Sequence, residues 1–117
     1  MDFVSTTEAL IKISENQRKL CRQYAQERHK YGEAKCDLGL QLVIHQDDPR
    51  YQKASFEKQL LLLLKETPEA QKDVFYSLYK DYVKCKQNYK GLDKMIQRNS
   101  EQISWTQSML KFAREND

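Results

Sequence analysis

The chain has 117 residues, of which 32% are charged, three are glycine and two are proline, and its net charge is +3. A composition so poor in turn residues, and rich in Glu, Gln, Lys and Leu, excludes a β-sandwich or β-barrel and is typical of long helices. Seven basic and six acidic residues lie in 1–45, four and four in 46–68, and nine and seven in 69–117, so no region is basic enough to require a nucleic-acid partner.

The length predicts a single all-helical domain, residues 1–117. Cys21, Cys36 and Cys85 lack the spacing of a disulfide framework or a zinc site, which favours a reducing, cytoplasmic environment. The longest apolar run, 60–64, is too short to cross a membrane, and the N-terminal residues lack the form of a secretory signal. We therefore expect a cytoplasmic protein without a membrane partner.

The first predicted helix spans about residues 6–45. It opens with 5–8, Ser-Thr-Thr-Glu, which has the form of a capping box with Ser5 as the N-cap. Mostly apolar residues then recur in steps of three and four, as in a helix that packs along one face. This row consists of Leu10, Ile13, Gln17, Leu20, Tyr24, Glu27, Tyr31, Ala34, Leu38 and Gln41.

A neighbouring row on the same helix is made of small residues. Its members are Cys21, Ala25, Gly32, Cys36 and Gly39. Because glycine within a helix costs about 1 kcal/mol relative to alanine, this row predicts the close approach of another helix.

Residues 46–50 form the clearest loop, because Pro49 lacks a backbone donor and disfavours helical geometry at Asp48. A short helix is predicted over about residues 53–65. Its leucines, 60–64, cover more than one face, so we expect this helix to be sandwiched between neighbours.

The third predicted helix, about residues 68–115, begins at Thr67-Pro68-Glu69, with Thr67 as N-cap and Pro68 as the first helical residue. Mostly apolar residues then recur in unbroken alternating steps of three and four positions. Such a sustained heptad row indicates coiled-coil packing. The row comprises Phe75, Leu78, Tyr82, Cys85, Tyr89, Leu92, Ile96, Asn99, Ile103, Thr106, Leu110 and Ala113. Asn99 in this row is expected to fix the register.

These elements predict an all-α fold: a long antiparallel helical hairpin, coiled-coil-like, with a short third helix near the turn. A slender hairpin cannot bury two wide apolar faces by itself, so we also expect a homo-oligomer, most simply a homodimer.

Catalytic signals are missing from the sequence. Neither His29 nor His45 has a Cys, Asp or His at a spacing that recurs in metal-binding sites. The Asp47-Asp48 pair suits a turn before Pro49. No glycine-rich phosphate loop, nucleophile elbow or zinc-protease motif is present. We predict no enzymatic activity and no catalytic, cofactor-binding or metal-binding residues.

Two surface rows are candidates for binding. Trp105, Met109 and Phe112 recur at i, i+4 and i+7 beside the heptad row, and exposed aromatic side chains of this kind anchor protein interfaces. The alternative is that these three residues pack on the first helix, on the short helix or on a second subunit.

The second row, Lys86, Lys90, Lys94 and Arg98, steps by four along one face of the third helix. It could follow a phosphate backbone, with Tyr76 or Tyr79 available for stacking on bases. The alternative is the ordinary solvated outer face of a coiled coil.

Residues 88–96, Asn-Tyr-Lys-Gly-Leu-Asp-Lys-Met-Ile, continue through 103–105, Ile-Ser-Trp, to Leu110-Lys111. This run, with 26–35, resembles small coiled-coil accessory proteins of bacteriophage and prophage early regions. The resemblance implies a small phage accessory factor, in a class that includes recombination-linked proteins and inhibitors of host defence nucleases such as anti-CRISPR proteins. It assigns no binding residue.

The leading interpretation is a non-enzymatic helical protein-interaction factor, phage-encoded and acting in the bacterial cytoplasm by docking on a protein partner. Inhibition of a host defence nuclease, as by an anti-CRISPR protein, is one form of this function. The alternative is a nucleic-acid-binding accessory factor of recombination or replication that uses the lysine row.

Overall fold

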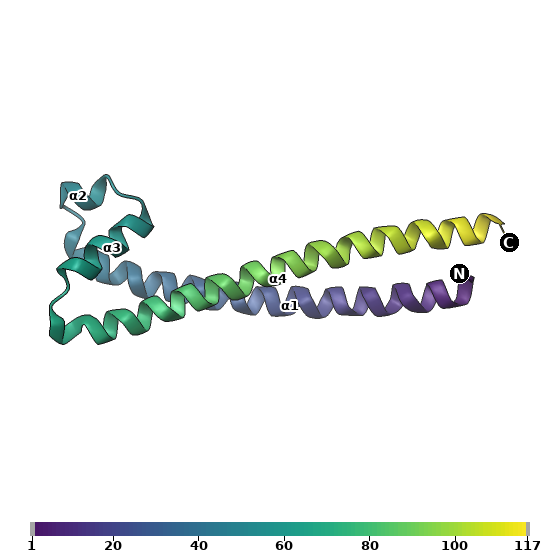
Figure 1. The fold of residues 1–117 in the computed structure, drawn as a ribbon, viewed down its shortest axis with the longest axis horizontal. Helices are drawn as coiled ribbons and strands as arrows, with labels where there is room; N and C mark the ends of the chain where they lie inside the picture. Colours follow the sequence, from purple (N-terminus) through teal and green to yellow (C-terminus); the bar gives the residue numbers. More distant parts are fainter. Residues whose placement is uncertain (1, 117) are drawn as a thin grey trace. The chain divides into compact units, whose positions relative to one another are not determined.

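The computed structural model describes residues 2–116, and within them it contains helices and no strand. The elements in chain order are α1 (Phe3–Leu42), the 3-10 helix η1 (Val43–His45), α2 (Pro49–Gln52), α3 (Phe56–Glu66) and α4 (Glu69–Asn116). α1 packs against α4, and the short helices lie between them in the chain (Figure 1). The predicted all-α helical hairpin is therefore confirmed.

The chain forms two compact units. Among the described residues, unit 1 comprises 2–27 with 88–116, and unit 2 comprises 28–87. Both long helices contribute to both units, so the prediction of one domain stays a prediction.

The start of α1 differs from the predicted capping box. Asp2, and not Ser5, caps the helix: the Ser5 N–H donates to Asp2 Oδ1 at 2.7 Å, and the Ser5 hydroxyl donates to Asp2 Oδ2 at 3.2 Å. The backbone hydrogen bond from Ser5 holds the pKa of Asp2 below its ordinary value. A carboxylate accepts such bonds and suits the positive end of the helix dipole, so Asp2 starts the helix earlier than Ser5 would.

The segment between the long helices is also more helical than predicted. The α-helical geometry of α1 ends at Leu42 and η1 continues to His45. Pro49 then starts α2, although the sequence predicted a loop over 46–50. Proline has no N–H to leave unsatisfied in a first turn, and Asp48 caps this turn by accepting from the Arg50 N–H at 2.9 Å.

α3 begins at Phe56 rather than 53, with Ser55 as its N-cap. Leu60 and Leu63 on its inner face are buried, whereas Leu61 on its outer face is 56% exposed. The prediction that both faces are covered is therefore wrong within the described chain.

The junction to α4 also differs from the prediction. Thr67 ends α3, because its hydroxyl donates back to the Leu63 carbonyl at 2.5 Å, and α4 begins at Glu69. Thr67 is therefore not the N-cap of the long helix. The predicted row of twelve residues from Phe75 to Ala113, here called the α4 seam, is confirmed, since each of its positions is buried or half-buried.

The small-residue row of α1 does not receive another helix of this chain. A Cβ added at Gly32 or Gly39 would meet nothing within 4 Å, and Cys21, Ala25 and Cys36 are exposed. The predicted close approach is therefore wrong for the packing within the chain.

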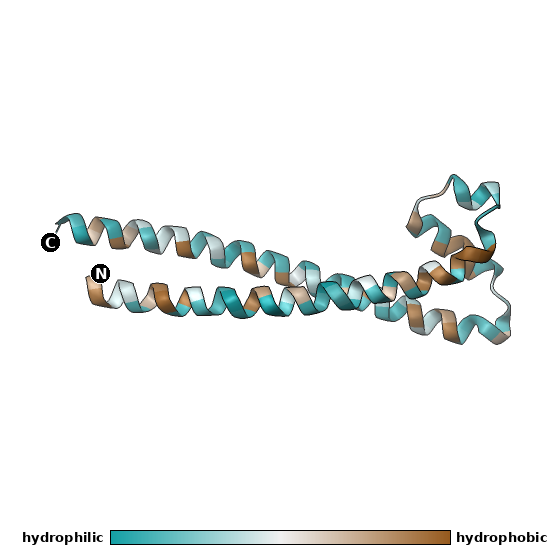
Figure 2. Cartoon of the chain, turned by 180° about the vertical axis from the view of Figure 1, so that it is seen from behind, coloured by the Kyte–Doolittle hydropathy of each residue, from teal (hydrophilic) through white to brown (hydrophobic). Residues whose placement is uncertain are grey.

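Unit 2 contains a conventional hydrophobic core. Its buried members are Ala34, Leu38, Tyr51, Leu60, Leu63, Phe75 and Tyr82. The Tyr82 ring stacks on Tyr31, with 5.3 Å between ring centroids, and makes an edge-to-face contact with Phe56 at 5.7 Å. Figure 2 shows the apolar residues concentrated in α3 and at the C-terminal end of α1.

Unit 1 is a two-helix segment whose fully buried residues are mostly polar. Leu20 is its one buried apolar residue among those described, whereas Thr6, Asn99 and Thr106 are buried polar residues. Asn99 Nδ2 donates to the Ile13 carbonyl at 3.0 Å and to Gln17 Oε1 at 2.7 Å. Because these partners lie on α1, the side chain of Asn99 ties one position of α4 to one turn of α1.

Candidate interaction surfaces

The first candidate is the Trp105 surface, defined as Trp105, Met109 and Phe112 on α4 of unit 1. Trp105 is 64% and Phe112 63% exposed, and Met109 is half-buried. The α4 seam faces α1, so these side chains lie outside the helix–helix contact. The alternative in which α1 covers the row does not hold in this structure.

The lysine row is divided by the structure. Lys86, in unit 2, is half-buried, with its Nζ 3.2 Å from Glu57 Oε1 and 5.7 Å from the centroid of the Tyr82 ring. Lys90, Lys94 and Arg98, in unit 1, are exposed. Lys86 thus has a role in the packing of unit 2 that the other three residues do not share.

The two tyrosines suggested for base stacking also differ in their exposure to solvent. Tyr79 is half-buried and stacks on Phe75 with 6.1 Å between ring centroids. Tyr76 is 44% exposed. Only Tyr76 keeps the exposure that stacking on a base requires.

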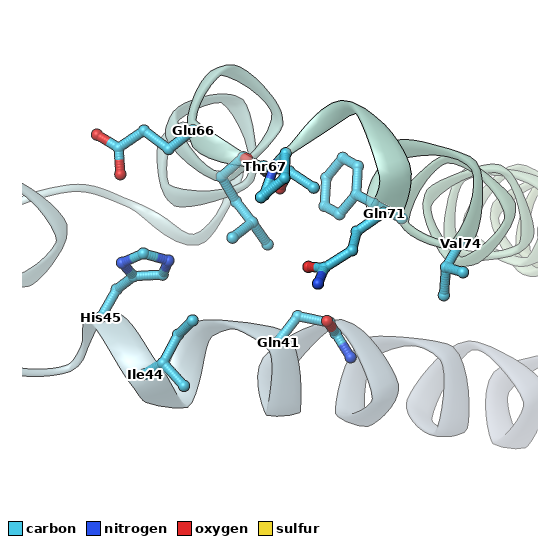
Figure 3. A pocket seen from close by; sticks show the side chains of 10 residues that line it. Gln41, Ile44, His45, Glu66, Thr67, Gln71 and Val74 are labelled. Carbon is cyan, nitrogen blue, oxygen red and sulfur yellow. Dashed lines mark hydrogen bonds between the residues drawn. The ribbon is translucent and has the colours of Figure 1, made fainter.

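A third feature, which the sequence did not indicate, is a small pocket in unit 2 at the start of α4 (Figure 3). It has a volume of about 250 Å³, and Leu63 and Phe75 contribute apolar atoms to its wall. The side chains of Gln41 and Gln71 lie across the pocket from each other, and Ile44 stands at its border. His45 and Glu66 are the titratable residues of its lining, and Glu66 accepts from the Tyr51 hydroxyl and pairs with Arg50.

A fourth feature is a basic groove between α2 and α3, which the sequence analysis also missed. Its lining residues are Arg50, Lys53, Ala54, Lys58, Leu61, Leu62 and Lys65. The spacing of Lys58, Leu61 and Lys65 within α3 already placed them on one face. The expectation that both faces of the leucine run are buried excludes an open groove at this place.

The histidines take part in local contacts. His45 stacks on Tyr51 with 4.4 Å between ring centroids, and His29 Nε2 lies 2.7 Å from Glu33 Oε1 on the exposed surface of α1. In residues 2–116, no three His, Cys, Asp or Glu side chains are grouped so as to hold a metal ion.

The cysteines are free, with Cys21 and Cys36 exposed and Cys85 half-buried in the α4 seam. None of the helices in the described part of the chain combines the length and apolar character needed to cross a membrane.

Comparison with protein-family models, with curated proteins and with solved structures finds no match to this chain. The interpretation of its surfaces therefore depends on their own geometry and chemistry.

Proposed function

We propose that this chain is a non-enzymatic helical interaction protein that docks on a protein partner through the Trp105 surface. The observation that carries the proposal is that Trp105 and Phe112 are 64% and 63% exposed on the same helix face. Large aromatic side chains bury roughly 150–250 Å² each on binding and often dominate the energy of an interface. Two of them, seven residues apart, are an apolar anchor without an internal partner.

We also propose that the chain is a homodimer in the cytoplasm. Unit 1 leaves Val4 and Ile11 of α1 65% and 53% exposed, in addition to the Trp105 surface of α4. We propose that the second copy covers Val4 and Ile11 and that the Trp105 surface receives the other partner. The free cysteines suit a reducing compartment.

Trp105 is the single tryptophan of the chain, so its fluorescence reports directly on this surface. Emission typical of a solvated indole should persist as the concentration of the pure protein is raised through dimer formation. If the emission instead shifts to the blue as the mass doubles, the Trp105 surface is the dimer interface and the proposed docking role is wrong.

Docking itself is tested with a photo-crosslinking amino acid at position 112, used in cells of the native source. Crosslinked partners should be lost when Trp105→Ala is added and retained with the matched pair Val4→Ala and Ile11→Ala. Crosslinking that does not depend on Trp105 contradicts the proposal. Circular dichroism should show equal helicity for all variants, because the replaced side chains are largely exposed.

The resemblance to phage accessory proteins suggests that the partner is a host defence nuclease, as for an anti-CRISPR protein. The net charge of +3 argues against mimicry of DNA, so inhibition would proceed by binding to the protein. Addition of the purified chain to a CRISPR effector cleavage assay should slow cleavage in a Trp105-dependent way. If the chain leaves cleavage unchanged for every type of effector, inhibition of a CRISPR nuclease is excluded as its function.

A second candidate function, a nucleic-acid accessory factor, is favoured by the exposure of Lys90, Lys94 and Arg98. Lys90→Glu with Lys94→Glu should weaken binding of labelled DNA or RNA, measured by anisotropy, and should reduce its salt dependence. The control, Lys12→Glu with Lys19→Glu, makes the same change of net charge on exposed positions of α1. Equal losses in both variants would mean that only net charge matters.

A further inference from the structure

The groove between α2 and α3 combines an apolar floor with a basic rim. It is an open depression of about 440 Å³ within unit 2. We define the basic groove by its floor, Leu61 and Leu62, and its rim, Arg50, Lys53, Lys58 and Lys65. These residues are distinct from the Trp105 surface and from the lysine row of α4.

The floor is an apolar face of α3 that the rest of the chain leaves open. Lys58, Leu61, Leu62 and Lys65 follow the spacing i, i+3, i+4 and i+7, which places them on one side of a helix. Leu60 and Leu63, which point the other way, are 1% and 5% exposed, whereas Leu61 is 56% exposed. α3 therefore presents leucine on two faces and buries one of them.

The rim carries positive charge that the chain itself does not neutralise. Arg50 is paired, with its guanidinium nitrogens 2.8 Å from Asp48 Oδ2 and 2.6 Å from Glu66 Oε1. Lys53, Lys58 and Lys65 are exposed, and no carboxylate of residues 2–116 lies within ion-pair distance of them. Three ammonium groups thus surround an exposed leucine without an internal counter-charge.

We propose that the basic groove binds an acidic amphipathic helix of a partner protein. Aliphatic side chains of that helix would bury Leu61 and Leu62, and carboxylates beside them would meet Lys53, Lys58 and Lys65. α3 has 11 residues and is roughly 16 Å long, which matches about three turns of a partner helix.

The composition of the groove distinguishes this occupant from others. Its lining contains no aromatic side chain on which a nucleic-acid base could stack. A second copy of the chain supplies no complementary charge, because the net charge is +3 and no segment is strongly acidic. A single exposed leucine offers little apolar area for insertion into a membrane surface.

The test uses a fluorescein-labelled helical peptide of about 18 residues, with leucines at i, i+3, i+4 and i+7 and glutamates beside them. Its anisotropy should rise on addition of the intact chain, whereas the same peptide with lysine in place of glutamate should not bind. Lys58→Glu with Lys65→Glu should weaken binding about tenfold or more, and so should Leu61→Ser.

The matched control is Lys80→Glu with Lys84→Glu, which changes the net charge equally at exposed positions of unit 2 and should alter affinity less than about twofold. Leu61 is exposed, so Leu61→Ser should keep the helicity of the wild type. Binding of the acidic peptide should also survive Trp105→Ala, which separates this site from the proposed docking function.

Four results would overturn the proposal. The first is equal binding of the glutamate and lysine peptides, and the second is an equal loss of affinity in the control variant. The third is binding of single-stranded DNA or phosphatidylglycerol vesicles, but not of the acidic peptide, that depends on Lys58 and Lys65. The fourth is dissociation of a dimer by Leu61→Ser, which would assign the groove to a second copy.

Discussion

The two units of this chain are built from the same two long helices but have different interiors. In unit 2, α3 adds a third layer and seven apolar or aromatic residues become buried. In unit 1, where α1 and α4 pair without a third helix, one buried apolar residue is accompanied by Thr6, Asn99 and Thr106. In unit 2 the third helix covers the other two and encloses a core. In unit 1 only two helices meet, so most residues of the seam stay partly exposed to solvent.

This difference separates stability from specificity. Burial of apolar area supplies most of the free energy of folding, and unit 2 holds seven of the eight buried apolar residues among those described. A polar side chain in a seam contributes less stability but penalises other registers, because a shifted register would leave it buried and unpaired. We therefore expect unit 2 to dominate stability and unit 1 to depend on its polar contacts for correct alignment.

The largest expected effect is in the core of unit 2. Leu60→Ala should lower the free energy of unfolding by about 2–5 kcal/mol, because Leu60 is 1% exposed and its removal leaves a cavity. The adjacent Leu61→Ala, at a position that is 56% exposed, should change it by less than about 0.5 kcal/mol. Urea denaturation followed by circular dichroism measures both, and equal effects would contradict the assignment of faces in α3.

The next effect concerns the register of unit 1. Asn99→Ala should destabilise the protein by about 1–3 kcal/mol, because the Ile13 carbonyl and Gln17 lose their donor. Asn99→Leu loses the same bonds but buries apolar area in their place. It should therefore destabilise the protein less than Asn99→Ala and produce more than one register, visible as doubled amide signals in NMR spectra.

Asn88→Ala is the control for Asn99, since Asn88 is an exposed residue of the same helix that bonds to Glu27 at 3.3 Å. It should leave a single set of amide signals. A single set for Asn99→Leu as well would show that the apolar seam fixes the register without Asn99.

A smaller expected effect is a pH dependence of the stability of unit 2. It comes from the hydrogen bond that the Tyr82 hydroxyl donates to Glu57 Oε1 at 2.6 Å. This bond, with Lys86, holds the pKa of Glu57 below its ordinary value, and burial together with Glu57 raises the pKa of Tyr82. The stability from Glu57 is present above the ordinary carboxyl pKa and is lost as the pH falls through the lowered one. The stability from Tyr82 is complete below about pH 10 and is lost as the pH rises further.

Tyr82→Phe removes the hydroxyl and should flatten both limbs of the stability profile. Near neutral pH this substitution should lower the free energy of unfolding by about 1 kcal/mol, because the Glu57 side chain is 51% exposed and water screens the bond. Thermal unfolding from pH 3 to 11 measures the profile, and an unchanged acid limb would mean that Glu57 is not coupled to Tyr82.

The smallest effect is local to the start of unit 1. Asp2→Ala removes the cap on the Ser5 N–H and should speed hydrogen exchange in the first turn of α1 without changing exchange in unit 2. Asp2→Asn keeps an acceptor at the N-cap and should restore most of the protection. If Ser5→Ala had the larger effect, the capping box predicted from the sequence would be correct after all.

The sequence alone predicted the class of fold and the main contact, because heptad periodicity is a local property of the chain. The row from Phe75 to Ala113 is the row that α4 buries, and most of the predicted row of α1 is buried or half-buried, although Gln41 is exposed. The spacing of Trp105, Met109 and Phe112 likewise indicated a second row outside the seam.

Only the tertiary structure decided which candidate residues are covered. The sequence could not separate Lys86 from Lys90, because the contact of Lys86 with Glu57 joins α4 to α3 through two residues that are 29 positions apart in the chain. It could not choose between the two leucine faces of α3, because periodicity gives the faces of a helix but not the number of its neighbours. Helix starts were decided by caps, because cap hydrogen bonds have similar energies. Asp2 caps α1 in place of Ser5, and Ser55 caps α3 by accepting from the Lys58 N–H, so α3 begins later than residue 53.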